Sequence, residues 1–315
     1  ESFVHLVSGV QSRAQRHLFF AEREAGKVAG VGKDTAPREV LKVGIIGAGT
    51  MGGGIAMAFA NGGFSVTVLE MSAEALDRGF ATIEKNYAIS VQRGSLKEEE
   101  KTARLARFSR TTDYADLAGC DLIVEAVFEE MAVKKEVFGR LDAVAKPGAI
   151  LATNTSYLDV NEIAASTSRP RDVVGLHFFS PANVMKLLEI VRGDATAPDV
   201  LATALAVARR IGKVPVVVGV CHGFVGNRML AARGEELEAL LLEGATPQQV
   251  DRVFTDFGFP MGPFQMYDLA GLDIGWRNRK ALGKTAAVAD ALCEQGRFGQ
   301  KTGKGFYLYE NGSRT

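Results

Sequence analysis

The chain has 315 residues, which is long enough for two domains that each bury a sizeable hydrophobic core. Charged residues make up 23% of it and hydrophobic residues 47%, as in ordinary soluble globular proteins. Lysine plus arginine and aspartate plus glutamate each number 37, so the balanced charge gives no support to binding nucleic acid or anionic membranes.

The three cysteines, Cys120, Cys221 and Cys293, are far apart and form no Cys-x-x-Cys pair. This spacing indicates a reducing compartment and argues against a disulfide framework or a structural zinc site, so we expect no metal. The longest uncharged stretch, residues 43–69, has the length of a membrane span. Because eight glycines interrupt it, we interpret it as a strand, a turn and a helix.

Residues 1–39 are expected to form a linker helix and a connector. Residues 11–30 have the spacing of an amphipathic helix, and residues 32–39 form the connector. The first thirty residues carry too many charges for a signal peptide. Because the chain begins at Glu1 without a methionine, we interpret it as a fragment of a longer protein.

Strand and helix patterns alternate between residues 40 and 221. Such alternation indicates a parallel sheet covered by helices. We therefore predict an α/β fold with a Rossmann-type, doubly wound, mostly parallel sheet, followed by an all-α C-terminal domain. The expected elements in chain order are 41–48, 51–61, 65–70, 73–93, 121–127, 131–145, 149–153, a hairpin at 173–191, 198–211 and 214–218.

Residues 222–315 have only helical patterns and are expected to form a helical domain for substrate binding or dimerisation. A glycine-rich, basic tail at 299–307 follows the last helix. The expected segments are 223–243, 247–257, 261–274 and 280–294.

A glycine-rich turn follows the first expected strand. Gly47, Gly49 and Gly52 form a GxGxxG motif between that strand and a helix. The first glycine permits a tight turn, the second lets the backbone approach a pyrophosphate, and the third permits close packing of the helix on the strand. The N–H groups at the start of the helix then face the phosphates. The motif predicts a dinucleotide site.

Glu70 ends the second expected strand. A carboxylate at this position accepts hydrogen bonds from the adenosine ribose hydroxyls and repels a 2′-phosphate. No arginine lies immediately beyond it in the sequence. We therefore predict NAD as the cofactor, in preference to NADP.

Polar residues also follow the next two expected strands. Ligands of open α/β sheets bind beyond the carboxyl ends of the strands. Glu129 and Lys134 follow the strand at 121–127 and are predicted to face the cofactor, with a solvated loop and helix face as the alternative. Ser156 follows the strand at 149–153 and is predicted to point into the same crevice. Its alternative role is to cap the following helix.

Two apolar runs, 173–179 and 187–191, flank a turn, and each contains one titratable residue, His177 or Glu189. In a hairpin centred on residue 183 these two residues lie opposite each other. Opposed side chains of an antiparallel pair are about 4.5–5.5 Å apart at Cβ. A carboxylate there fixes the imidazole tautomer and stabilises its protonated form, as a general acid/base requires. The alternative is a core histidine with an unrelated partner.

The helical half opens with Asn227, a neutral donor and acceptor in an otherwise apolar helix start. Such a side chain is suited to holding a carbonyl oxygen, and helix capping or a helix–helix hydrogen bond is the alternative. His222 precedes this helix without an evident acidic partner, so we predict a residue at the surface.

Taken together, these segments resemble the (S)-3-hydroxyacyl-CoA dehydrogenase family of fatty-acid β-oxidation. The resemblance covers nearly the whole chain, from Lys42 to Tyr309. Its motifs are Gly-Ala-Gly-Thr-Met-Gly at 47–52, Val-Glu-Ala-Val at 124–127, Asn-Thr-Ser at 154–156, His-Phe-Phe-Ser-Pro at 177–181, Lys-Leu-Leu-Glu at 186–189 and Gly-Phe-Val-Gly-Asn-Arg at 223–228.

The resemblance implies roles for individual residues. His177 is implied to be the catalytic base and Glu189 its orienting partner, while Ser156 and Asn227 surround the substrate's oxygens. One position departs from many family members, which have asparagine where this chain has Ser180, so the contact with the nicotinamide end is shorter in reach. The residues implied to line NAD are Gly47, Gly49, Met51, Gly52, Glu70, Val127, Glu129, Lys134, Ser156 and Ser180.

The activity that the resemblance implies is NAD-dependent oxidation of a 3-hydroxyacyl-CoA to the 3-ketoacyl-CoA. The N-terminal helix and the segment at 268–276 resemble the multifunctional β-oxidation enzymes, in which an enoyl-CoA hydratase domain precedes the dehydrogenase. Those enzymes carry a second helical domain after the glycine-rich tail, and this chain stops at Thr315 without it. Two alternatives are a dehydrogenase of free hydroxy acids and a non-catalytic NAD-binding fragment.

The expected partners are an acyl-CoA substrate and the hydratase domain of the parent chain, with a homodimer as one option. We expect a bacterial cytoplasmic location, or a peroxisomal one if the protein is eukaryotic.

Overall fold

The computed structural model describes residues 2–32, 34–310 and 313–314. The contacts within the chain divide it into two compact units, Glu1–Val225 and Gly226–Thr315. The division lies four residues beyond the predicted boundary at 221, because Phe224 is buried in a hydrophobic cluster of the first unit.

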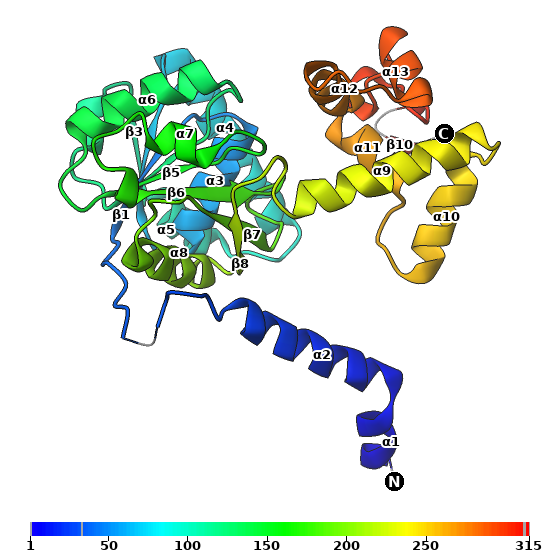
Figure 1. Ribbon diagram of the computed structural model, residues 1–315, viewed down its shortest axis with the longest axis horizontal. Coiled ribbons are helices and arrows are strands. Elements are labelled where there is room, and N and C mark those ends of the chain that lie inside the picture. Colours follow the sequence, from blue (N-terminus) through cyan, green and yellow to red (C-terminus); the bar gives the residue numbers. More distant parts are fainter. Residues whose placement is uncertain (1, 33, 311–312, 315) are drawn as a thin grey trace. The chain divides into compact units, whose positions relative to one another are not determined.

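The first unit is built on one eight-stranded sheet with the order β3-β2-β1-β4-β5-β6-β7-β8 (Figure 1). Neighbouring strands run parallel except for β6 and β7, which are antiparallel. The strands are β1 Lys42–Ile46, β2 Ser65–Leu69, β3 Phe108–Thr111, β4 Leu122–Glu125, β5 Ile150–Thr153, β6 Val173–Phe178, β7 Leu187–Arg192 and β8 Val214–Gly219. The predicted doubly wound, mostly parallel sheet is confirmed.

The central strands are buried on both faces. Every residue of β4, β5 and β6 is buried, which explains why these strands are mostly apolar and show no polar–apolar alternation; their polar residues, Glu125, Thr153 and His177, lie near the carboxyl ends. Two hydrophobic clusters cover the two faces of the sheet. Helices α3, α4 and α8 contribute to one cluster, and α6 and α7 contribute to the other.

The helices of this unit agree with the predicted pattern except at the short helices Val160–Ala164 and Pro170–Asp172, for which no range was predicted, and between residues 94 and 120. There the sequence analysis placed no element, and the structure has a charged helix, an edge strand and a short 3-10 helix. Half-exposed segments of this kind lack the apolar periodicity that marks core elements. The helices are α3 Thr50–Asn61, α4 Ala73–Gln92, α5 Glu98–Leu105, η1 Tyr114–Leu117, α6 Met131–Val144, α7 Val160–Ala164, η2 Pro170–Asp172 and α8 Pro198–Arg210.

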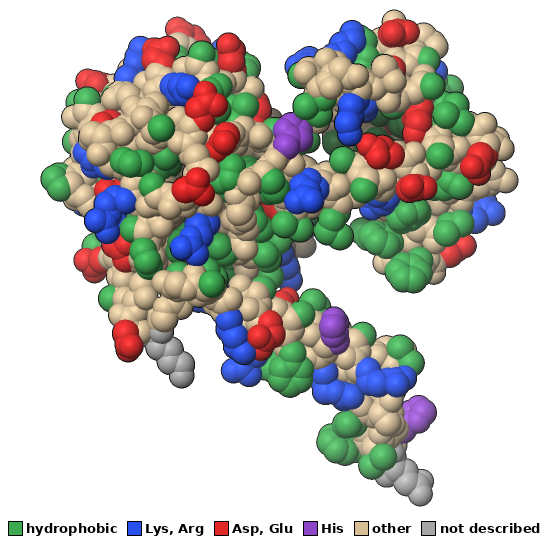
Figure 2. Space-filling model, viewed as in Figure 1, with side chains coloured by type: hydrophobic (Ala, Val, Ile, Leu, Met, Phe, Trp, Pro, Cys, Tyr) green, Lys and Arg blue, Asp and Glu red, His purple; other side chains and the backbone are tan. Residues whose placement is uncertain are grey.

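The N-terminal segment forms two helices where one was predicted. They are α1 Ser2–Ser8 and α2 Val10–Ala25, and Gly26 ends the second five residues before the expected end at residue 30. Neither helix buries a residue. Hydrophobic side chains are exposed along both (Figure 2).

Arg38 ties the connector that follows to helix α8 and to two segments beside it. Its guanidinium binds the carboxylates of Asp172 and Asp199, each at 2.8 Å, and donates to the Gly148 carbonyl at 3.0 Å. Its backbone N–H donates to the Thr203 hydroxyl. The predicted linker therefore ends as a fixed part of the first unit.

The second unit is helical, with a small core around Leu237, Val250, Phe264 and Tyr307. The predicted helix at 280–294 is wrong, because Gly283 adopts a left-handed φ of +65° between two separate helices. The elements are α9 Gly226–Leu242, α10 Pro247–Phe257, α11 Pro263–Ala270, α12 Leu272–Ala281, α13 Ala287–Glu294, η3 Gln300–Thr302, β9 Tyr309–Glu310 and β10 Ser313–Arg314.

None of the helices in the described part of the chain has the length and apolarity that crossing a membrane requires.

Asp268 ties the C-terminal tail to the helices of the second unit. This fully buried carboxylate accepts hydrogen bonds from the backbone N–H groups of Phe306 and Tyr307 and from the Tyr309 hydroxyl, at 2.8, 2.9 and 3.0 Å. Three donors converge on one side chain, and burial raises the pKa of its carboxyl group. This carboxylate fixes the tail together with Asp251, which accepts from the Tyr307 hydroxyl at 2.7 Å.

We predict that Asp268→Asn destabilises the second unit by about 1–3 kcal/mol, because an amide presents N–H groups where three donors need an acceptor. Chemical denaturation followed by circular dichroism measures the change. The control is Asp256→Asn in the same unit, where the side chain is exposed and the expected change is close to zero. Equal stability of the two variants would contradict this account of the tail.

Candidate active site

The predicted site residues of the first unit converge on one edge of the sheet. Strands β1, β4, β5 and β6 are mutually parallel, so their carboxyl ends lie at the same edge. The glycine turn follows β1, Glu125 ends β4, residues 154–156 follow β5, and His177 is the second-last residue of β6.

The glycine turn has the geometry that a dinucleotide requires. Gly47 has a φ of +101°, and a Cβ there would lie 2.8 Å from the Ala126 carbonyl oxygen. A Cβ on Gly52 would lie 1.9 Å from the Gly47 carbonyl oxygen, so helix α3 packs directly on the turn. A Cβ on Gly49 would meet nothing within 4 Å, which leaves open space in front of the backbone.

The start of α3 fits a pyrophosphate. Gly49 is its N-cap and no side chain caps the helix, so its first N–H groups are left for a ligand. Met51 is half-buried in the first turn. These features, with the open space at Gly49, match the cradle that NAD needs.

Glu70 lies half-buried beside this turn. One carboxylate oxygen accepts from the Ala48 N–H and the other from the Met71 N–H, both at 2.9 Å. These bonds fix the carboxylate next to the glycine turn. Each oxygen keeps a further lone pair, so the predicted contact with ribose hydroxyls remains sterically and chemically feasible.

A buried ionic network lies beneath the ends of β4 and β5. Glu125 is fully buried and accepts from the Lys134 ammonium at 2.7 Å, the Val127 N–H at 2.8 Å and the Thr153 hydroxyl at 2.8 Å. The side chain of Lys134 is only 1% exposed. The solvated alternative for Lys134 is therefore wrong, and its ammonium lies under the loop, with Glu129 3.5 Å away.

Glu129 positions the backbone around Ser156. One of its oxygens accepts from the Thr155 hydroxyl at 2.6 Å and from the backbone N–H groups of Ser156 and Tyr157 at 2.7 and 2.9 Å. Ser156 does not cap the next helix, because the Asp159 side chain accepts from Asn161 N–H at the start of α7. The capping alternative for Ser156 is thus excluded.

The predicted His177–Glu189 pair is present. The two residues are directly opposed in the antiparallel register of β6 and β7, and His177 Nδ1 lies 2.7 Å from Glu189 Oε2. Both are buried, with 3% and 1% of the residue exposed. Because Nδ1 binds the carboxylate, Nε2 is the nitrogen that can exchange a proton with a substrate.

Residues that the sequence analysis did not single out complete this pair. The Val225 N–H donates to the second oxygen of Glu189 at 3.0 Å. Phe224 has a positive φ of +47°, which is unusual for a residue other than glycine. The centre of its buried ring lies 5.5 Å from that of the His177 imidazole, and the centre of the Phe179 ring lies 4.5 Å from it. Asn154 accepts from the Phe178 N–H and joins β5 to β6. In the sequence, only the Gly-Phe-Val-Gly motif at 223–226 drew attention to Phe224 and Val225.

Two predicted positions of the first unit, Ser180 and His222, lie outside this buried centre, and a third, Asn227, belongs to the second unit. Ser180 is exposed in the turn after β6. Asn227 is half-buried in the first turn of α9, in the second unit. His222 is exposed, as predicted, and its ring lies 4.9 Å from that of Tyr157.

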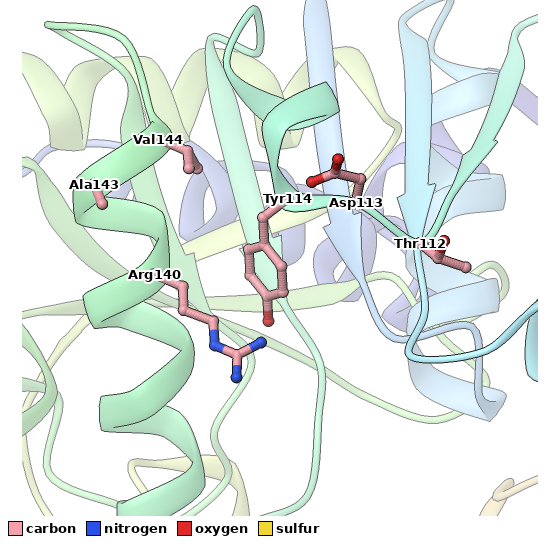
Figure 3. A pocket seen from close by; sticks show the side chains of 6 residues that line it. All are labelled: Thr112, Asp113, Tyr114, Arg140, Ala143 and Val144. Carbon is pink, nitrogen blue, oxygen red and sulfur yellow. The ribbon is translucent and has the colours of Figure 1, made fainter.

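A separate open hollow contains none of the predicted residues. It is formed by η1, the residues before it and α6, and Figure 3 shows the Arg140 guanidinium beside the Tyr114 ring. Their centres are 5.4 Å apart. The lining residues are Thr112, Asp113, Tyr114, Arg140, Ala143 and Val144. None of these lining residues is a histidine.

Comparison with models of protein families identifies the family of this chain. Residues 42–221 match the model of the 3-hydroxyacyl-CoA dehydrogenase NAD-binding domain, and residues 223–309 match that of the C-terminal domain. The chain belongs to the 3-hydroxyacyl-CoA dehydrogenase family. Its first unit carries the NAD-binding domain of that family, as the glycine turn predicts.

Individual relatives agree with this assignment. The chain is 45% identical to the peroxisomal bifunctional enzyme of Cavia porcellus, over 98% of this chain and 46% of that protein. It therefore spans about half the length of such relatives and corresponds to their dehydrogenase part.

Solved structures of two relatives are also similar. One is (S)-3-hydroxybutyryl-CoA dehydrogenase from Ralstonia eutropha, at 34% identity and a TM-score of 0.81, covering 87% of this chain and all of that one. The other is the dehydrogenase part of multifunctional enzyme 1 from C. elegans, at 35% identity and a TM-score of 0.73, covering 94% of this chain and 71% of that one.

We predict that Gly52→Ala weakens NADH binding by at least about 10-fold, because the new methyl group would collide with the Gly47 carbonyl and displace α3 from the phosphate cradle. Quenching or enhancement of NADH fluorescence on titration measures the dissociation constant. The matched control is Gly53→Ala, one residue along the same helix, where the nearest atom would be 3.7 Å away. Wild-type affinity in the Gly52 variant would refute the close-packing argument.

Proposed function

We propose that this chain oxidises (S)-3-hydroxyacyl-CoA to 3-ketoacyl-CoA with NAD, and that His177 is the general base. The observation that carries the proposal is the buried His177–Glu189 pair at the ligand-binding edge of an NAD-binding domain. Family membership supports the reaction class. The geometry of the pair supports the assignment of the base.

His177 and Glu189 have different roles in the proposed proton transfer. Glu189 accepts a hydrogen bond from Nδ1–H, which leaves Nε2 unprotonated and able to take the proton of the substrate's 3-hydroxyl group. The imidazolium that forms is then stabilised by the adjacent carboxylate. The Val225 N–H keeps that carboxylate in place, and the rings of Phe179 and Phe224 keep water away from the imidazole.

The remaining site residues are proposed to bind and orient NAD and the substrate. Bound NAD supplies the acceptor for the hydride that leaves C3. We propose that the turn at Gly47, Gly49 and Gly52, with Met51, holds the pyrophosphate side of NAD, and that Glu70 holds the adenosine ribose.

At the other half of the cofactor we propose a lining of Val127, Glu129, Ser156 and Ser180, with Lys134 acting from beneath through Glu129. Ser156, whose backbone is fixed by Glu129, and Asn227 are proposed to hold the 3-oxygen of the substrate. We keep the division into a connector (1–39), an NAD-binding domain (40–221) and a helical domain (222–315) as part of the proposal.

The proposed substrate is an acyl-CoA, since a similar solved structure is a 3-hydroxybutyryl-CoA dehydrogenase. The relatives' greater length supports a hydratase domain in the parent chain. A homodimer of the chain stays a prediction. A peroxisomal location is proposed if the protein is eukaryotic, as the name of the guinea pig relative indicates, and a cytoplasmic one if it is bacterial.

We predict that His177→Gln lowers kcat by about 10²–10⁴-fold, because the variant has no group that accepts the hydroxyl proton. NADH affinity should remain within about two-fold, since the imidazole contacts none of the phosphate cradle. Oxidation of NADH with acetoacetyl-CoA, followed at its absorbance band, gives the rate. The control is His222→Gln, an exposed histidine that should keep wild-type turnover. Retention of turnover by His177→Gln would sink the assignment.

Glu189→Gln tests the partner separately. The amide keeps a hydrogen bond to Nδ1 but carries no charge to stabilise the imidazolium, so kcat should fall by about 10-fold or more.

Comparing the rates on acetoacetyl-CoA and free acetoacetate separates the main proposal from a dehydrogenase of free hydroxy acids. NADH binding without turnover on either compound would indicate a non-catalytic NAD-binding fragment.

A further inference from the structure

Lys213 is a buried lysine that the proposed mechanism does not use. It lies between the end of α8 at Arg210 and the start of β8 at Val214, and only 7% of the residue is exposed. Because β8 runs parallel to β7, and β7 begins where the turn after β6 ends, Lys213 lies at the side of the sheet where that turn is found.

The Lys213 ammonium binds two backbone carbonyls of this turn. Nζ donates to the Ala182 oxygen and to the Met185 oxygen, each at 2.6 Å. In the described part of the chain no carboxylate forms an ion pair with it, and burial lowers the pKa of its ammonium group. A buried cation without a counter-ion is costly, so these two charge-assisted hydrogen bonds are its evident structural purpose.

The turn itself, residues 180–186, is closed by backbone hydrogen bonds from the N–H groups of Val184 and Met185 to the Pro181 carbonyl, each at 2.9 Å. Its Ser180, Val184 and Met185 are exposed, whereas Ala182 is 1% exposed. Ala182 packs against α3 at Gly54, where an added Cβ would lie 3.1 Å from the Ala182 Cβ. The turn is therefore held between the helix of the phosphate cradle and the Lys213 ammonium.

We propose that Lys213 is a positioning residue for the nicotinamide half of the cofactor, acting through the 180–186 turn that follows His177. The proposal rests on the proposed function, because Ser180 is the turn residue assigned to that half. Lys213 touches neither His177 nor Glu189, so it acts only by fixing backbone. Misplacing a cofactor-contacting group by about 1 Å can cost about 10²-fold in rate.

The test compares two ligands on one variant. Lys213→Met keeps an unbranched side chain as far as the ε position and removes the ammonium. We expect kcat for acetoacetyl-CoA reduction by NADH to fall at least about 10-fold. Affinity for ADP-ribose, which lacks the nicotinamide, should stay within about two-fold. The control is Lys101→Met on helix α5, whose ammonium pairs with Glu98 at the surface, and it should match wild type.

A purely structural role predicts another result. Loss of ADP-ribose and NADH affinity in parallel, or unchanged kcat and KM for NADH, would overturn the proposal. Hydrogen exchange of the peptide covering 180–186 gives an independent readout, and Lys213→Met should speed exchange there while leaving β6 protected. If Lys213→Met does not fold, Lys213→Gln, which retains one donor group, is judged by the same readouts.

Failure of the proposed function itself would look different. A wild-type chain that binds NADH without turnover refutes the reaction but leaves the binding and exchange comparison intact. In that case a selective loss of NADH over ADP-ribose affinity in Lys213→Met still supports the positioning role, and equal affinities reject it.

Discussion

The contact on which the site depends is the 2.7 Å hydrogen bond between His177 and Glu189, formed across the antiparallel pair β6–β7. In an otherwise parallel sheet, this one reversal places two successive strands side by side and brings a carboxylate opposite an imidazole. A parallel neighbour would have needed a crossover of a dozen or more residues. Here eight residues separate the strands, so the proposed acid/base pair is local in sequence and its spacing follows from the register.

Much of this was predictable because it is periodic or depends on spacing. The alternation of strands and helices indicates the doubly wound sheet, the GxGxxG turn indicates the phosphate cradle, and equal distances from residue 183 indicate the opposed pair. The missed elements between residues 94 and 120 are half-exposed, where packing sets little of the pattern. In the second unit, the break at Gly283 depends on a left-handed residue that periodicity does not reveal.

The features that could not be predicted depend on contacts that form only in the complete fold. Arg38 binds carboxylates 134 and 161 residues away, which local spacing cannot indicate. Lys134 binds Glu125, nine residues earlier, and this pairing depends on the burial of both side chains. Two lysines illustrate the difference. The sequence leaves Lys134, after β4, as a cofactor contact or a solvated charge and gives no signal for Lys213, before β8, yet both are buried and bind groups of the protein. Burial, which decides their roles, is a property of the whole fold.

The hydrogen bond from Val225 to Glu189 has a consequence for dissecting the protein into parts. The family models meet at residues 221 and 223, and a gene cut there would separate the NAD-binding half from Phe224 and Val225. The excised half would keep its sheet, its glycine turn and the histidine, but Glu189 would lose a backbone donor and the imidazole an aromatic neighbour. Nucleotide binding and the proposed proton transfer therefore have different minimal lengths of chain: the glycine turn lies before the domain border, and the contacts of the His177–Glu189 pair extend past it.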